Sequence, residues 1–269
     1  MTPQKILRIL PAAAVLGFAA AALAQDAPAA EDAVPDFTGI WTAYSGANQG
    51  RSPGFGAPRP GLPLTEEGQR RVEEYRQLAG PERLNSATHC ATYGVPTMMS
   101  MPGSYPLEFI HKPDQLTIIF EVGDETRRIY IGDRQLPPEQ RIPSRAGYSQ
   151  GHWEGNVLVI ETTDLLDSQD QPANPYSEEA TINERFFVEE DANGTPVLTY
   201  QATINDPVYY TEPVTIERKY QPYDGFMLPY ACQDELWYEL LELRRAQLEA
   251  GETIDARMSD VYQIREDKE

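Results

Sequence analysis

Residues 148–163 read YSQGHWEGNVLVIETT and carry the pattern that decides the fold. The stretch from His152 to Thr163 is predicted as a strand pair, or as one bent strand, around the dipeptide Gly155-Asn156. A second glycine, Gly151, precedes the His-Trp-Glu triplet, so the backbone can bend there or approach another group closely. The stretch therefore predicts a sheet whose strands carry polar side chains among apolar ones.

Similar patterns recur on both sides of this stretch. Short runs with a period of two, bounded by Gly, Pro, Asn or Asp, predict further strands. These strands are Phe37–Tyr44, Leu107–Ile110, Leu116–Glu121, Arg127–Ile131, Thr181–Glu189, Val197–Asn205 and Val214–Tyr220. No helical pattern interrupts the strands after Leu107, so we expect short connections and an antiparallel sheet.

Two helices flank the predicted strands. The first begins at Thr65, an expected N-cap, and runs to about Leu78; its few apolar residues predict a surface position. The second spans Gln233–Ala250, where Leu236, Leu240 and Leu243 form one apolar stripe.

About eight antiparallel strands followed by one amphipathic helix favour a mainly β fold, a closed lipocalin-like (calycin-type) barrel with the helix packed outside, because closure removes exposed strand edges. A β-sandwich is the alternative. We expect a single barrel domain with its helix over residues 37–250 and a charged tail over residues 251–269.

Composition limits the possible functions. The chain has 269 residues and a formal net charge of -20, and such a surface repels the phosphates of nucleic acids, so no nucleic-acid partner is expected. Hydrophobic residues make up 41%, which is too many for a wholly disordered chain.

The first residues have the features of a secretory signal peptide. Lys5 and Arg8 precede an apolar run from Leu10 to Leu23, which is too short to span a bilayer, and Ala22-Leu23-Ala24 fits a cleavage site. We therefore expect residues 1–24 to be removed, a disordered leader over residues 25–36, and a periplasmic or secreted protein without a transmembrane segment.

Export bears on the expected state of the two cysteines, Cys90 and Cys232. An oxidising compartment favours a disulfide between them, which would close a long loop and restrict the unfolded chain. Two separate buried thiols are the alternative.

Several predicted strands place charged or aromatic polar side chains among large apolar ones. Such residues are the solvated face of a half-buried sheet, or else they point inward and form a polar pocket with shifted pKa values. For the pocket, the candidate catalytic residues are Glu121, His152, Glu161 and Arg185, and the candidate ligand-binding residues are Arg128, Tyr130, Tyr148, Trp153 and Glu184. A slip of one residue in a strand would reverse which of them point inward.

Several motifs together resemble those of a large group of exported, mostly uncharacterised bacterial proteins. They are Ser-x-Gly-x-Trp-Glu-Gly at 149–155, Glu121 followed by Arg128-Ile129-Tyr130, Ser177-Glu178 followed by Glu184-Arg185-Phe186, Asp206-Pro207, Tyr210-Thr211-Glu212-Pro213, and Cys232. The resemblance implies a lipocalin-like barrel outside the cytoplasm and assigns no activity. Members of that group often have a histidine where this chain has Ile182, which puts any chemistry of that histidine in doubt here.

No cofactor or metal is expected. The three histidines, His89, His111 and His152, are too far apart in sequence to form a local metal-binding pair, and no phosphate- or dinucleotide-binding loop occurs.

Three functions are compatible with these features. The first is a barrel that binds a small hydrophobic or aromatic molecule in a polar-lined cavity. The second is a cofactor-independent isomerase, cyclase or lyase that uses barrel carboxylates. The third is a surface-interaction protein. The sequence determines neither the ligand nor the oligomeric state.

Overall fold

The computed structural model describes residues 34–46, 61–79, 91–100, 105–170, 173–230, 235–257 and 260, with no side-chain description at 235–236. The predicted signal peptide, most of the leader and both cysteines lie outside these ranges. Cleavage after residue 24 and the disulfide between Cys90 and Cys232 therefore stay predictions.

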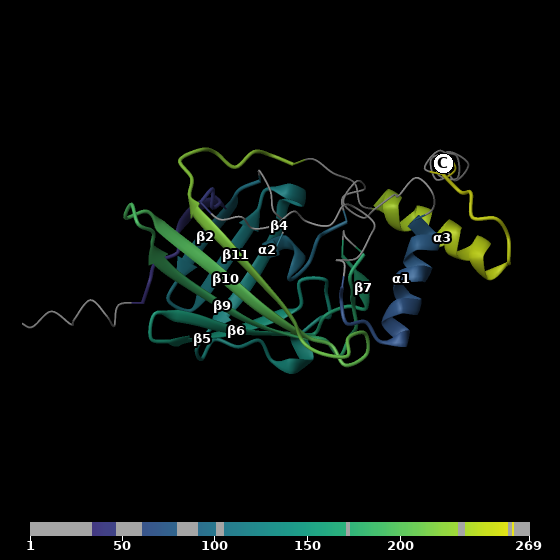
Figure 1. Ribbon diagram of the computed structural model, residues 1–269, viewed down its shortest axis with the longest axis horizontal. Coiled ribbons are helices and arrows are strands. Elements are labelled where there is room, and N and C mark those ends of the chain that lie inside the picture. The colour runs from purple at the N-terminus through teal and green to yellow at the C-terminus, as the bar shows by residue number, and fades with distance from the viewer. Residues whose placement is uncertain are drawn as a thin grey trace, which may run out of the picture.

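Nine strands form a closed barrel, followed by a C-terminal helix (Figure 1). This confirms the predicted mainly β barrel, with one strand more than the sequence indicated. The order around the barrel is β1 (Gly39–Ala43), β11 (Val214–Pro222), β10 (Pro196–Asn205), β9 (Thr181–Glu190), β6 (Val157–Thr163), β5 (Tyr148–Glu154), β4 (Glu125–Ile131), β3 (Gln115–Phe120) and β2 (Leu107–Lys112). A separate two-stranded hairpin of β7 (Ser168–Gln169) and β8 (Pro175–Tyr176), which the sequence did not indicate, lies between the barrel and the helices.

The expectation of a wholly antiparallel sheet is wrong at one place, the contact between β4 and β5. These strands are parallel and pair only from Ile129 with Ser149 to Ile131 with Gly151. The physical reason is the connector 132–147, which is long enough to carry the chain back to the start of the next strand. We call this short parallel contact the seam.

Aromatic side chains occupy the middle of the barrel. The Phe186 ring lies 4.9 Å from that of Tyr200, 6.1 Å from that of Phe109 and 6.3 Å from that of Phe37, measured between centroids. All four residues are fully buried and belong to the main hydrophobic core. The period of two along each strand thus builds a filled interior, in which aromatic contacts add to the free energy of burial.

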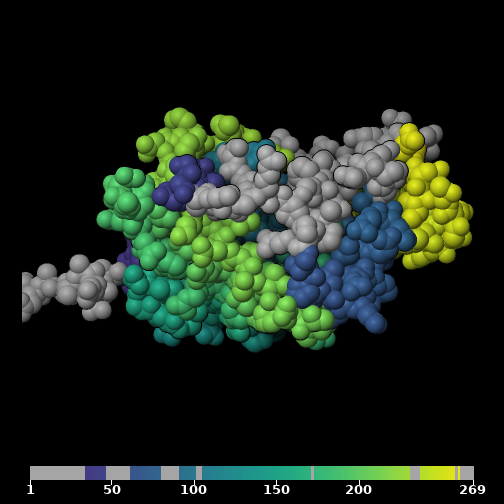
Figure 2. Space-filling model, viewed as in Figure 1, coloured from purple at the N-terminus to yellow at the C-terminus, as the bar shows by residue number. Residues whose placement is uncertain are grey.

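The two long helices, α1 (Glu66–Ala79) and α3 (Glu235–Glu249), lie side by side at one end of the molecule (Figures 1 and 2). Thr65 is the N-cap of α1, as predicted, because its hydroxyl accepts the Gly68 N–H at 3.0 Å. Buried Arg244 of α3 donates to the carbonyls of Leu78 and Ala79, each at 2.9 Å, at the negative end of the α1 dipole.

This pairing corrects two expectations about the helices. The predicted surface helix α1 buries Val72, Tyr75 and Leu78, and α3 packs against α1 instead of lying directly on the barrel wall. The short helix α2 (Thr97–Ser100) contacts β11 with its buried methionines. No helix among the described residues is long and apolar enough to cross a membrane.

Candidate functional site

One polar network crosses the inside of the barrel. Five neighbouring strands, β4, β5, β6, β9 and β10, each contribute one residue to it: Arg127, Ser149, Thr162, Glu184 and Tyr200. The Arg127 guanidinium bonds the Glu184 carboxylate in a bidentate pair, with Nη1 to Oε2 at 2.7 Å and Nη2 to Oε1 at 2.5 Å. Both side chains are at least 99% buried, with exposures of 1% and 0%.

The hydroxyl groups complete the bonding of this pair. Ser149 Oγ and Thr162 Oγ1 accept from Arg127 Nη2, each at 2.9 Å, and Thr162 donates to Glu184 Oε1 at 2.7 Å. Tyr200 donates to Glu184 Oε2 at 3.0 Å. A buried ion pair is costly unless its remaining donors and acceptors are bonded, and here they are.

The electrostatics follow from burial and pairing. Burial alone would lower the pKa of Arg127, but the charge and hydrogen bonds of Glu184 outweigh burial and raise the pKa above its ordinary value. Burial, followed by the neighbouring Glu184 charge, raises the pKa of Tyr200 well above its ordinary value. Arg127 therefore stays charged and Tyr200 stays protonated as a donor at any physiological pH.

A cavity of about 220 Å³ lies in the barrel wall above this network, on the β4 side of the seam. The wall is open there because Thr126–Arg128 precede the three paired residues of β4, so the backbone of β5 does not pair with theirs. The lining residues are Thr126, Arg127, Arg128, Tyr130, Leu136, Arg141, Ile142, Ser144, Ala146, Gly147, Tyr148 and Ser149. We call this the wall cavity.

Every charged residue among the described residues that line the wall cavity is an arginine. Arg127 is paired with Glu184, but no carboxylate among the described residues forms an ion pair with Arg128 or Arg141. In a chain with a net charge of -20, this is a local reversal of sign. Such a cavity favours a ligand that carries a negative charge.

Aromatic rings provide the apolar part of the wall cavity. Tyr130 and Tyr148 stack with their centroids 5.7 Å apart. The Arg141 guanidinium lies 4.1 Å from the centre of the Tyr148 ring, and the Tyr148 hydroxyl donates to Gln150 Oε1 at 2.7 Å. These contacts fix the rings and leave a surface suited to stacking.

The structure brings together four of the predicted ligand-binding residues. Arg128, Tyr130 and Tyr148 line the wall cavity, although from the outer face of the barrel wall and not from its interior. Glu184 lies beneath the cavity and reaches it through Arg127. Trp153 is separate, because it packs at the Phe37 end of the barrel with ring centroids 5.6 Å apart.

The four predicted catalytic residues are not brought together at one pocket. On the outer face, His152 Nε2 lies 3.5 Å from Glu154 Oε1 and Arg185 Nη1 lies 3.2 Å from Glu154 Oε2. Glu161 is also exposed on the outside. Glu121 is buried near the end of β3, where it accepts the Leu228 N–H at 2.7 Å.

A pocket inside the barrel that includes Glu161, Arg128 and Arg185 is therefore a wrong prediction, because these three side chains lie on the outer face of their strands. The physical reason is the period of two, which places the neighbours Thr162, Arg127 and Glu184 inside instead.

Arg127, Ser149, Thr162, Tyr200 and Arg141 are the residues of this site that the sequence reasoning missed. One signal for Arg127 was present, because it alternates with Ile129 and Ile131 on one face of β4. No comparable signal marked Arg141, which lies in the Pro-rich connector.

Within the described ranges, no group of three His, Cys, Asp or Glu side chains could hold a metal ion. Comparisons with protein-family models, curated proteins and solved structures found no match. The resemblance to exported bacterial proteins thus stays a prediction from the motifs, while the barrel itself is shown.

Glu184→Gln tests the buried pair. We expect the free energy of unfolding to fall by about 3–5 kcal/mol, because the substitution leaves the Arg127 charge buried without a counter-charge. Arg185→Gln is the matched control on the next residue of β9, whose exposed ion pair is worth about 0–1 kcal/mol. Urea unfolding measures both, and equal losses in the two variants would contradict a stabilising role for the pair.

Proposed function

We propose that the chain is an exported binding protein and that the wall cavity holds a small aromatic molecule with an acidic group. The observation that carries this proposal is the lining of the cavity, whose described residues include three arginines, two stacked tyrosines and no carboxylate. The tyrosine rings contact the aromatic part of the ligand, and the arginines contact its acidic group.

The buried network supports binding because it fixes the floor of the cavity. Arg127 is held by Glu184, Ser149 and Thr162, so its position changes little when a ligand enters. No carboxylate in the described part of the chain pairs with Arg128 or Arg141, so none has to be displaced when the ligand binds. Such preorganisation lowers the cost of binding.

Export is a separate part of the proposal and rests on residues 1–24. Lys5 and Arg8, the apolar run and the Ala-x-Ala site together have the form of a cleaved signal. A ligand would then be met in the periplasm or the medium.

Titration with 4-hydroxybenzoate tests the binding site. We expect heat of binding in calorimetry, and we expect 4-hydroxybenzyl alcohol, which lacks the negative charge, to bind at least about tenfold more weakly. Arg128→Gln should weaken 4-hydroxybenzoate binding about tenfold, since it removes one charge-assisted contact at the rim.

Arg76→Gln is the control, because the Arg76 side chain is exposed on α1, outside the lining of the wall cavity, and pairs with Glu73 at 2.8 Å. It should leave the affinity unchanged. Equal affinity for the acid and the alcohol, or no binding of either, would contradict an anion-binding wall cavity.

The mass of the chain recovered from the exported fraction tests export. A mature chain that begins at Gln25 is expected. Recovery only in the cytoplasm, with Met1 to Ala24 retained, would contradict export without affecting the binding proposal.

A further inference from the structure

A second cavity, of about 230 Å³, lies where the two helices meet the β7–β8 hairpin. It shares no described lining residue with the wall cavity, although Arg145 of its lining lies between Ser144 and Ala146 of the other. Its lining residues are Arg71, Tyr75, Leu78, Arg145, Asp167, Ser168, Gln169, Trp237, Tyr238, Leu241, Glu242 and Arg245. We call it the junction cavity.

Two buried donors at the junction cavity have no hydrogen-bond partner. Among the described residues, nothing bonds to the Nε2 of Gln169 or to the Nε of Arg71, although both atoms are inaccessible to solvent. Gln169 is only 8% exposed, so its amide lies inside the fold. Leaving a buried donor unbonded destabilises a fold, so two of them at one cavity are a sign that an acceptor belongs there.

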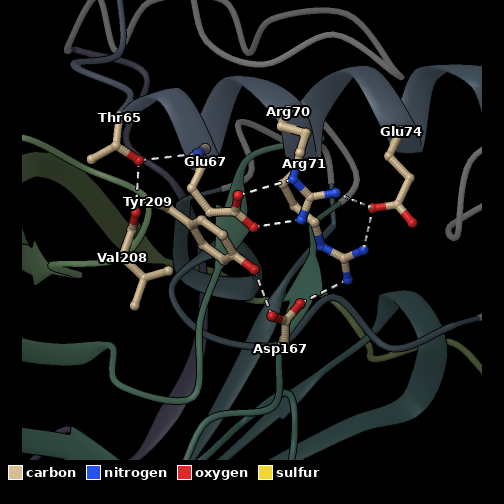
Figure 3. A network of polar contacts seen from close by, with 9 residues as sticks. Thr65, Glu67, Arg70, Arg71, Glu74, Asp167, Val208 and Tyr209 are labelled. Atoms are coloured by element: carbon tan, nitrogen blue, oxygen red, sulfur yellow. Dashed lines mark hydrogen bonds and ion pairs between the residues drawn. The ribbon is translucent and has the colours of Figure 1, made fainter.

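The acceptors nearby are already used. Figure 3 shows that Asp167 bonds both to α1 and to Tyr209: its Oδ1 accepts from Arg71 Nη2 at 2.7 Å, and its Oδ2 accepts from the Tyr209 hydroxyl at 2.5 Å. Arg71 Nη1 donates to Glu74 Oε2 at 3.0 Å. Glu242, the other carboxylate of the lining, accepts from Arg245 Nη1 at 3.2 Å. The two unbonded buried atoms are both donors, so a ligand that bonds to them must supply acceptor oxygens.

The charge and the lining of the cavity restrict the class of ligand further. Arg145 is fixed by the carbonyls of Thr92 and Gln169, each at 2.6 Å, and no described carboxylate forms an ion pair with it. The opposite side of the cavity is the apolar cluster around Tyr75 and Trp237. The cavity thus has a cationic, donor-rich side and an apolar side.

We propose that the junction cavity is a second binding site, for a small carboxylic acid with an apolar body. The carboxylate accepts from Gln169 Nε2 and Arg71 Nε beside the Arg145 charge, and the apolar body lies against the Trp237 side. Because the cavity includes α1, α3 and the hairpin, an occupant also links the helical pair to the barrel side of the molecule.

The probe is 3-methylbutanoate, compared with the neutral 3-methylbutanamide. The readout is the indole N–H signal of Trp237 in the NMR spectrum of protein with ¹⁵N-labelled tryptophan, assigned with Trp237→Phe. Trp237 lines the junction cavity, whereas no tryptophan lines the wall cavity, so this signal reports on the second site alone. We expect 3-methylbutanoate to shift this signal until it saturates. The amide should need at least about a tenfold higher concentration for half of its full shift.

Gln169→Met separates a ligand role from a structural one. It removes the unbonded donor at equal length, so the midpoint of thermal unfolding of the free protein should not fall, while the affinity for 3-methylbutanoate should fall about tenfold. Gln77→Met, on the exposed face of α1, is the control and should bind as the parent chain does.

Three results would overturn the proposal: no shift of the Trp237 signal, equal shifts with acid and amide, or unchanged affinity in Gln169→Met. None of them bears on the wall cavity, which 4-hydroxybenzoate tests independently.

Discussion

The ion pair between Arg127 and Glu184 is the interaction on which the rest of this barrel depends. It bridges the seam, where β4 and β5 share only three paired residues. Arg127 compensates for that short ladder, because it bonds Ser149 on β5, Thr162 on β6 and Glu184 on β9. A single side chain thus links four strands across one of the barrel's short contacts, and the only parallel one among the described strands.

The same interaction explains why the barrel wall can contain a cavity while the charges buried beneath it stay paired. Below the wall cavity, the hydroxyls of Thr162 and Tyr200 complete the bonding of Glu184, so no buried charge is left unpaired. Above it, Arg128 and Arg141 line the cavity and form no ion pair with a carboxylate of the described ranges. The proposed binding site is therefore the outer side of the network that closes the barrel.

Sequence patterns predict the barrel well because alternation is a local property. They do not predict which face of a strand points inward. Arg127 and Arg128 are neighbours on β4, and only one of them can face the interior. The apolar partner Ile129 fixes the choice once the strand register is known. Contacts made only by the fold, such as the position of Gln169 in a two-residue strand beside α1, leave no periodic signal and could not be predicted.

The most direct test of the central interaction is the NMR signal of the Arg127 side-chain N–H groups, assigned with Arg127→Met, and its rate of exchange with solvent. Five hydrogen bonds to Glu184, Ser149 and Thr162 at 99% burial predict N–H signals that exchange far more slowly than those of exposed Arg128. Exchange as fast as that of Arg128 would show that the pair does not hold the seam closed.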